Sequence, residues 1–191
     1  MAYRRSSETF AEGRERRAAI DDPAVVLEAA ARFLEARSRS IAEVRRRLGR
    51  AGYRPELVES AIVRLAELGM LDDEAFGRAW VESRDRARPR GEIALRRELA
   101  LKGVDRAVVD ELLDERRSPG GQAPEGAGVD LEAARRLLAR SARSLARVAD
   151  LRQRRQRAYA LLARHGFGPE TCREAASELI AAEEVADLDE T

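Results

Sequence analysis

One short pattern occurs three times along the 191 residues of this chain: a leucine, a glycine four positions later, and then an apolar residue. The three copies are Leu48–Tyr53, Leu99–Val104 and Leu162–Phe167. A helix with this pattern ends at a glycine in the left-handed conformation, and the apolar residue then folds back onto the last helical turn. Copies 51 and 63 residues apart are typical of tandem helical units. The sequence therefore predicts three modules built on the same plan.

Each copy of the pattern lies in the middle of a predicted three-helix module. The spacing of apolar residues predicts a leading helix in each module, over 24–37, 73–86 and 131–148. In the second of these helices, Phe76, Ala79 and Trp80 are expected to face inward. The closing helices of modules 1 and 3 begin at Pro55 and Pro169, because the fixed φ of proline suits the first helical position. The expected N-cap residues are Ser40, Asp72, Asp105 and Asp130.

Composition supports an all-α fold. Charged residues make up 37% of the chain and aromatic residues only 4%, which favours helices with charged outer faces and apolar seams. No stretch alternates β-branched or aromatic residues with polar ones over a useful length. We therefore predict an elongated tandem array of three helix-turn-helix-like modules that share apolar surface with their neighbours. The predicted parts are a disordered basic arm (1–22), module 1 (23–71), module 2 (72–115), a Pro/Gly-rich linker (116–129), module 3 (130–182) and a disordered acidic tail (183–191).

The charge of the chain is nearly balanced overall and uneven locally. A formal net charge of +1 excludes a strongly basic nucleic-acid binder. Residues 130–182 nevertheless hold eleven arginines against six acids, whereas 183–191 holds five acids and no base. Lys102 is the only lysine, so the positive surface consists of guanidinium groups, whose planar donors suit carboxylates and phosphates.

The arginines supply the candidate partner-binding residues. Arg45 and Arg46 of module 1 recur 51 positions later as Arg96 and Arg97 in module 2. A single arginine on a helix is often only part of a solvated face, but together these residues favour an acidic partner or a groove. The twelve candidates are Arg45, Arg46, Arg84, Arg88, Arg90, Arg96, Arg97, Lys102, Arg152, Arg154, Arg155 and Arg157.

Residues suited to catalysis are few. The single cysteine, Cys172, falls in an apolar stripe and is expected to be a buried thiol. The single histidine, His165, precedes a C-cap glycine, where a cation suits the helix dipole. The adjacent glycines Gly120 and Gly121 lie in the linker and form no phosphate loop. We predict no catalytic residue, no metal site, no cofactor and no enzymatic activity.

The first 20 residues are polar and rich in arginine. They contain no apolar stretch that would form a secretory signal or a membrane span. A single cysteine also fits a reducing compartment. These features predict a cytoplasmic protein that does not associate with a membrane.

Several stretches together resemble the RecX family of regulatory proteins. Module 2 carries Leu68–Phe76, Arg88–Gly91 and Arg96–Val104 in the order and spacing of that family. The flanking modules add Ser40–Leu48 and Tyr159–Phe167. The resemblance covers all three modules, although the Pro/Gly-rich linker is longer than is usual in the family.

The resemblance implies a cytosolic regulator that binds the RecA nucleoprotein filament along its helical groove. It would inhibit the recombinase, strand-exchange and ATPase activities of RecA in DNA repair and the SOS response. RecA would be the main partner, single- or double-stranded DNA a further one, and the protein a monomer. The alternative is a helix-turn-helix regulator that binds bare DNA. Near-neutral charge and the lack of an obvious recognition helix argue against that alternative.

Overall fold

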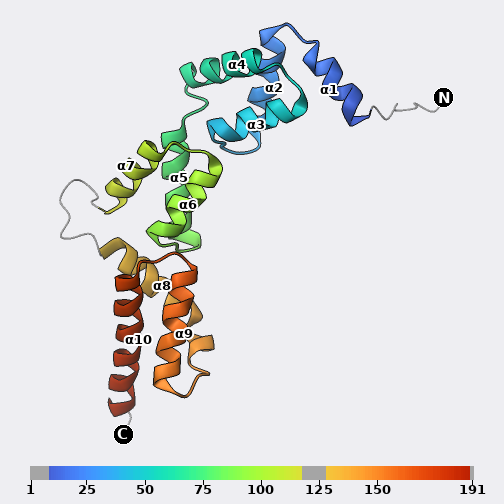
Figure 1. Cartoon of the computed structure of the whole chain (residues 1–191). Helices are drawn as coiled ribbons and strands as arrows, with labels where there is room; N and C mark the ends of the chain where they lie inside the picture. Colours follow the sequence, from blue (N-terminus) through green and yellow to red (C-terminus); the bar gives the residue numbers. More distant parts are fainter. Residues whose placement is uncertain (1–8, 118–127, 190–191) are drawn as a thin grey trace. The chain divides into compact units, whose positions relative to one another are not determined.

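The computed structural model describes residues 9–117 and 128–189, and this part of the chain forms helices and no strand (Figure 1). The helices are α1 (Phe10–Ala18), α2 (Pro23–Glu35), α3 (Ile41–Ala51), α4 (Pro55–Glu67), α5 (Asp73–Ala87), α6 (Glu92–Lys102), α7 (Arg106–Arg117), α8 (Gly128–Leu145), α9 (Leu151–Arg164) and α10 (Pro169–Asp189). Module 1 comprises α2–α4, module 2 comprises α5–α7 and module 3 comprises α8–α10. The predicted all-α fold of three three-helix modules is confirmed.

The chain divides into two compact units. Unit 1 runs to Phe76 and also takes in Lys102–Val104, at the end of α6. Unit 2 holds Gly77–Leu101 and the chain from Asp105 onward. Module 2 therefore contributes residues to both units.

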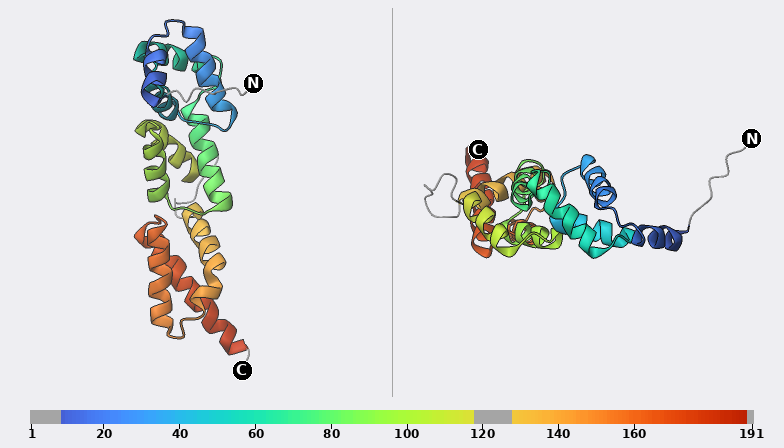
Figure 2. Two further views of the ribbon diagram at one scale, coloured as in Figure 1. Left: turned by 90° about the vertical axis from the view of Figure 1, so that its right-hand side faces the viewer. Right: turned by 90° about the horizontal axis from the view of Figure 1, so that it is seen from above.

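Each unit contains an apolar cluster drawn from the helical stripes that the sequence predicts. The buried side chains of unit 1 include Val26, Val44, Leu48, Val58 and Leu65. Those of module 3, in unit 2, include Leu138, Ala158, Leu162, Phe167 and Cys172. In module 3, α9 and α10 lie side by side, as Figure 1 and the left view of Figure 2 show.

Local capping explains where several helices begin. The Ser40 hydroxyl accepts a hydrogen bond from the backbone N–H of Glu43 at 3.1 Å, and the Glu43 carboxylate accepts one from the N–H of Ser40 at 3.4 Å. Asp72 and Asp105 cap α5 and α7 with their carboxylates. The closing helices α4 and α10 begin at the predicted prolines. These predicted helix starts are confirmed.

Asp130 has a different role from the one predicted. The helix α8 begins at Gly128, so Asp130 lies in its first turn and the predicted N-cap is wrong. The Asp130 carboxylate instead accepts hydrogen bonds from the Arg116 side chain at 2.6 Å and from the backbone N–H of Glu92 at 3.1 Å. Both partners come from module 2, and helical spacing within module 3 does not reveal them.

The three repeated glycines have left-handed backbones. Their φ angles are 101° at Gly52, 80° at Gly103 and 81° at Gly166. An L side chain in this conformation crowds the following carbonyl oxygen, at a cost of about 1–2 kcal/mol. The predicted glycine C-caps are therefore confirmed.

The helix α1 contradicts the prediction of a disordered arm over residues 1–22. Thr9 and Glu12 form a capping box at its start. At its other end, Arg17 Nε donates a hydrogen bond to the carbonyl oxygen of Ala51, the last residue of α3, at 2.6 Å. A helix this short is unstable alone, so its order depends on docking onto α3. A polar sequence does not disclose that tertiary contact, and residues 1–8 lie outside the described part.

Two further boundaries need correction. The predicted linker 116–129 is shorter, because Arg116 belongs to α7 and α8 begins at Gly128. The residues between these helices lie outside the described part. The helix α10 continues to Asp189, so the segment 183–191 is helical over most of its length. Alanine and glutamate, which are strong helix formers, recur at this end of α10.

The inward face of α5 differs from the prediction at one position. Phe76 is buried, but Ala79 is exposed, and Gly77 and Val81 are buried instead. A Cβ atom at Gly77 would lie 2.5 Å from Cδ1 of Leu112. Because the absence of a side chain at Gly77 lets α7 approach there, α5 packs on the side of Gly77 and leaves Ala79 in solvent.

One junction between modules occurs in unit 1. The Asp73 carboxylate, at the start of α5, accepts a hydrogen bond from the backbone N–H of Ile41, the first residue of α3, at 2.8 Å. The Ser40 hydroxyl donates to the carbonyl oxygen of the last residue of α6 at 2.7 Å. Gly103 lies close to Ala42, since a Cβ atom at Gly103 would be 2.4 Å from the Ala42 Cβ. The first turn of α3 is thus enclosed by two segments of module 2.

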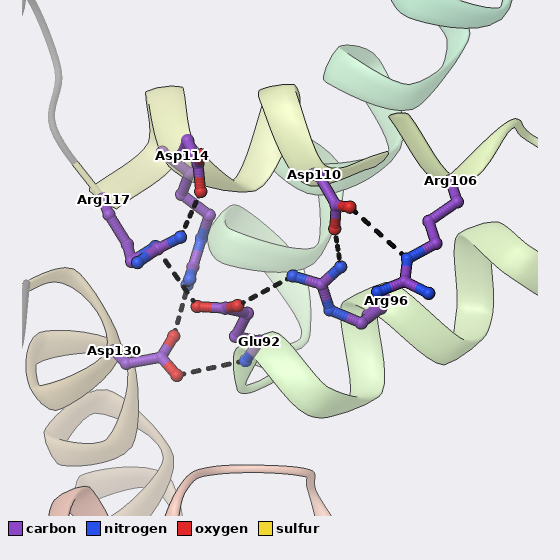
Figure 3. A network of polar contacts seen from close by, with 8 residues as sticks. Glu92, Arg96, Arg106, Asp110, Asp114, Arg117 and Asp130 are labelled. Atoms are coloured by element: carbon purple, nitrogen blue, oxygen red, sulfur yellow. Dashed lines mark hydrogen bonds and ion pairs between the residues drawn. The ribbon is translucent and has the colours of Figure 1, made fainter. Parts of the chain in front are cut away.

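Unit 2 contains the corresponding junction, between modules 2 and 3 (Figure 3). Asp130 of α8 accepts the hydrogen bond from the backbone N–H of Glu92, the first residue of α6. Gly166 lies close to Ala94, since a Cβ atom at Gly166 would be 2.4 Å from the Ala94 Cβ. The N–H of Gly91 donates to the carbonyl oxygen of the residue before Gly166 at 3.1 Å. Glu92 lies 51 residues after its counterpart in unit 1, so the junction follows the sequence repeat.

Substitutions of Asp73 test whether the first junction depends on the hydrogen bond that this side chain accepts or on its negative charge. Burial, together with the charge of Asp72, raises the pKa of Asp73, and the hydrogen bond from Ile41 does not reverse this shift. A carboxyl group with a raised pKa in the folded state favours folding most at low pH, and this contribution is lost as pH rises through the folded pKa. At neutral pH we therefore expect Asp73→Asn, which keeps the acceptor, to be at least as stable as the natural protein.

The matched variant Asp73→Ala leaves the N–H of Ile41 without its acceptor. We expect it to be about 1 kcal/mol less stable than the natural protein in urea denaturation at neutral pH. If Asp73→Asn were as destabilised as Asp73→Ala, the ionised carboxylate rather than the acceptor would hold the junction together.

Candidate partner-binding surface

One member of the repeated arginine pair is engaged inside its own module. Arg45 of α3 donates two hydrogen bonds to Glu59 of α4, from Nε to Oε1 at 2.5 Å and from Nη2 to Oε2 at 2.7 Å. Arg96 of α6 pairs with Asp110 of α7 (Figure 3). The hydrogen bond from each guanidinium holds the pKa of the facing carboxyl below its usual value. In both modules this pair ties the middle helix to the closing helix.

Glu98 brings together two further candidates in unit 2. Arg84 Nε donates to Glu98 Oε2 at 2.7 Å, and Arg90 Nε lies 3.3 Å from Glu98 Oε1. The indole N–H of Trp80 also donates to Oε2, at 2.9 Å, and the Arg84 guanidinium lies 4.2 Å from the centre of the Trp80 ring. The ring therefore has a cation–π partner on its face and a carboxylate at its edge, an arrangement that disfavours its use for stacking on a base.

Three other candidates contact neighbouring groups. Lys102 Nζ donates to Glu43 Oε1 at 2.9 Å. Burial alone would raise the pKa of Glu43, but the hydrogen bond and charge of Lys102 lower it overall. Arg46 donates to the Lys102 carbonyl oxygen at 3.4 Å, and Arg154 Nε donates to the carbonyl oxygen of Val148 at 2.8 Å.

The side chains of the remaining five candidates are exposed and, among the described residues, have neither a hydrogen bond nor an ion pair. They are Arg88, Arg97, Arg152, Arg155 and Arg157. Three of these, the α9 arginines Arg152, Arg155 and Arg157, lie on one helix of module 3. Arg152 and Arg155 are almost one turn apart and share a face, whereas Arg157 points to a different side. Their guanidinium groups are available to an acidic partner.

A hollow of about 390 Å³ lies beside Arg155, between α9 and α10. It is lined by Arg155, Gln156, Tyr159, Arg173, Ala176 and Ser177. Arg173 is not among the predicted candidates. The sequence repeat could have identified it. Offsets of 51 and then 63 residues lead from Arg45 to Arg96 and Tyr159. The same offsets lead from Glu59 to Asp110 and Arg173.

The residues considered for chemistry serve the helix ends. Cys172 is fully buried with Sγ 3.5 Å from the carbonyl oxygen of Phe167, and burial raises the pKa of its thiol. The predicted buried thiol is confirmed. His165 Nδ1 lies 2.9 Å from the carbonyl oxygen of Leu161, within α9. In residues 9–117 and 128–189, no group of three or more His, Cys, Asp or Glu side chains is placed to hold a metal ion. None of the helices described there is long and apolar enough to cross a bilayer.

All three modules match sequence models of the RecX domains. Residues 27–65 match the first three-helix domain of RecX, residues 72–113 the second and residues 129–176 the third. The matches occur in the same order as the domains they represent.

Individual relatives give the same result. The regulatory protein RecX of Mycobacterium avium is 32% identical over 152 residues, which cover 80% of this chain and 83% of that protein. The RecX of Prosthecochloris aestuarii is 32% identical over 148 residues, which cover 78% and 89%. That of Pelodictyon phaeoclathratiforme is 41% identical over 86 residues, but this alignment spans only about half of that protein, 54%.

Two solved structures have a similar fold. The crystal structure of RecX from Lactobacillus salivarius has a TM-score of 0.70 at 18% identity, covering 83% of this chain and 97% of that one. A second crystal structure of a regulatory protein RecX has a TM-score of 0.69 at 20% identity, covering 81% and 73%. At sequence identities this low, the similarity to these two structures shows the fold alone.

Proposed function

This chain belongs to the RecX family of regulatory proteins, and we propose that it binds the RecA nucleoprotein filament and inhibits its recombinase, strand-exchange and ATPase activities. In this role it acts as a cytoplasmic monomer in DNA repair and the SOS response and performs no chemistry of its own. The observation that carries the proposal is the match of all three modules, in order, to the three RecX domains.

A tandem array suits a polymeric partner. Once one module has bound a protomer, the next module meets a neighbouring protomer at high effective concentration, so weak contacts add up to a stable complex. The α9 arginines are the proposed contacts of module 3. Guanidinium groups form charge-assisted, two-point hydrogen bonds with carboxylates, and they also bind the phosphates of filament DNA.

The ATPase of preformed RecA filaments tests the proposed function. We expect hydrolysis to fall progressively after the protein is added, with ATP regenerated throughout so that substrate depletion plays no part. A steady rate of hydrolysis at saturating protein would contradict the proposal. Comparison with and without an excess of free RecA separates blocked filament growth from action on existing filaments.

Neutralising the α9 arginines tests their part in binding. The triple variant Arg152→Gln, Arg155→Gln, Arg157→Gln should bind filaments roughly 10-fold more weakly, because each exposed ion pair contributes at most about 1 kcal/mol. The matched control removes three arginines that are already paired, through Arg32→Gln, Arg64→Gln and Arg78→Gln. Equal loss in both triple variants would indicate an effect of net charge alone.

The rival function, a helix-turn-helix reader of bare DNA, is tested by competition. Fluorescence anisotropy compares a bare duplex, a bare single strand and a RecA-coated strand as competitors for the same protein. We expect the RecA-coated strand to compete best, whereas a reader of bare DNA would prefer one duplex sequence.

A further inference from the structure

The hollow between α9 and α10 combines two unpaired arginines with an apolar floor. Arg155 and Arg173 line it from different helices, and neither has an ion pair among the residues that the structure describes. The Ala176 side chain is 1% exposed, and the Tyr159 ring is half-buried. The lining also contains the Ser177 hydroxyl and the Gln156 amide, and it contains no acidic residue.

The other two modules close the corresponding place with a carboxylate. In module 1 that place is occupied by the Arg45–Glu59 ion pair. In module 2 it is occupied by the Arg96–Asp110 ion pair. In both, the arginine lies on the middle helix and the acid on the closing helix.

Module 3 has neither the arginine nor the acid of this pair at the two positions. The position of Arg45 and Arg96 is taken by Tyr159, and the position of the acid is taken by Arg173. The result is an open hollow with positive charge on both of its helices where the sister modules hold a neutralised pair.

We propose that this hollow receives an aspartate or glutamate side chain of the protein partner, which replaces the acid that modules 1 and 2 supply internally. Arg173 and Arg155 would donate charge-assisted hydrogen bonds to the carboxylate. The Tyr159 ring and Ala176 would pack against the apolar stem of the incoming side chain. This inference rests on the proposed function for the identity of the partner, the RecA filament.

The size and chemistry of the hollow favour a carboxylate over a nucleic-acid strand. A volume of about 390 Å³ is near the lower end of the range for ligand pockets and suits one or two side chains. Binding a strand requires a groove with a series of phosphate contacts and successive aromatic platforms. This lining offers two arginines and one aromatic ring.

The inference is tested by giving module 3 the ion pair of its sisters. The closed variant, Tyr159→Arg with Arg173→Glu, should restore a pair between α9 and α10 and fill the hollow. We expect unchanged helicity and no loss in melting temperature, together with about 30-fold weaker binding to RecA-coated single strands. Arg64→Gln, which lowers the net charge by the same one unit at a distant paired site, should bind normally.

The bare single strand serves as the second arm of the binding assay. Loss of affinity for the coated strand alone supports a protein carboxylate. Equal loss for bare and coated strands would show that the hollow binds phosphate, and full retention by the closed variant would show that it is not a docking site. Either of these outcomes overturns the inference while leaving the proposed function intact.

A probe that needs no filament keeps the inference testable if filament binding fails. A short peptide that alternates glutamate and leucine is titrated into the full chain while NMR follows the Tyr159 ring and the Arg173 Nε–H. Both signals should shift with this peptide and not with its glutamine counterpart. The Ala176 methyl signal should shift with them in the natural protein and stay unchanged in the closed variant, which lacks Tyr159 and Arg173. Identical responses to the two peptides, or no response to either, would overturn the inference.

Discussion

Gly91→Ala will lower the stability of unit 2 by about 3 kcal/mol, because the added methyl group has no room at the junction between modules 2 and 3. The new Cβ would lie 2.3 Å from the carbonyl oxygen of Gly166 and 2.4 Å from the Cα and N atoms of Phe167. These are backbone atoms, so no side-chain rotation relieves the clash. Relief requires the two segments to separate, which breaks the hydrogen bond from the Gly91 N–H to the His165 carbonyl oxygen.

Urea denaturation followed by the fluorescence of Trp80, which lies in unit 2 and is the only tryptophan of the chain, measures this loss. Gly168→Ala is the matched control. It adds the same methyl group in the same unit, but no atom lies within 4 Å of the new Cβ. We expect it to cost about 1 kcal/mol or less, as for alanine at a helix N-cap. Equal losses in the two variants would mean that the junction is not closely packed at Gly91.

Arg116→Met will destabilise unit 2 by roughly 3 kcal/mol, because it leaves two carboxylates without their shared partner. The Arg116 side chain is 6% exposed. Its Nε and Nη2 each lie 2.9 Å from an Asp85 oxygen, and its Nη1 lies 2.6 Å from Asp130. Asp130 also accepts the N–H of Glu92, so the loss extends to the junction with module 3.

The protonation of the Arg116 guanidinium decides how this loss of stability depends on pH. Burial alone would lower the pKa of Arg116, but its hydrogen bonds to Asp85 and Asp130 raise it overall. A cation whose pKa is raised on folding stabilises the protein fully at every pH below its unfolded pKa. The contribution of Arg116 is therefore constant across the neutral range, and the deficit of Arg116→Met should be constant there as well.

A double-mutant cycle separates the ion pair from simple packing. Combining Arg116→Met with Asp85→Asn removes one of the two stranded charges, so the double variant should be less destabilised than the two single losses together. Chemical denaturation of the four proteins gives the coupling free energy. Strictly additive losses would contradict the pairing of Arg116 with Asp85.

The sequence predicts local structure well because the responsible interactions span only a few residues. The Ser40 capping box, the proline at the start of α4 and the left-handed backbone of Gly166 each depend on near neighbours. The errors occur where distant segments intervene. The helix α1 is ordered by docking onto α3, and Ala79 is exposed because α7 approaches α5 at Gly77.

For the candidate surface, too, the sequence predicts the local features and misses the contacts between distant residues. The repeat identified a matching arginine pair in modules 1 and 2, but it did not show that Arg45 and Arg96 each pair with an acid fourteen residues further along the chain. Arg116, expected in a linker, has the lowest exposure among the ion-paired side chains of the described residues. Whether an arginine is available to a partner depends on which acids the fold places beside it.

Helical periodicity and capping are properties of short stretches, so the helices, their caps and the threefold repeat could be predicted from the amino-acid sequence alone. Which charges are neutralised, which glycines lie at module junctions and where module 3 remains open depend on the folded arrangement. Those features arise from residues far apart in the chain, and packing brings them within hydrogen-bond distance.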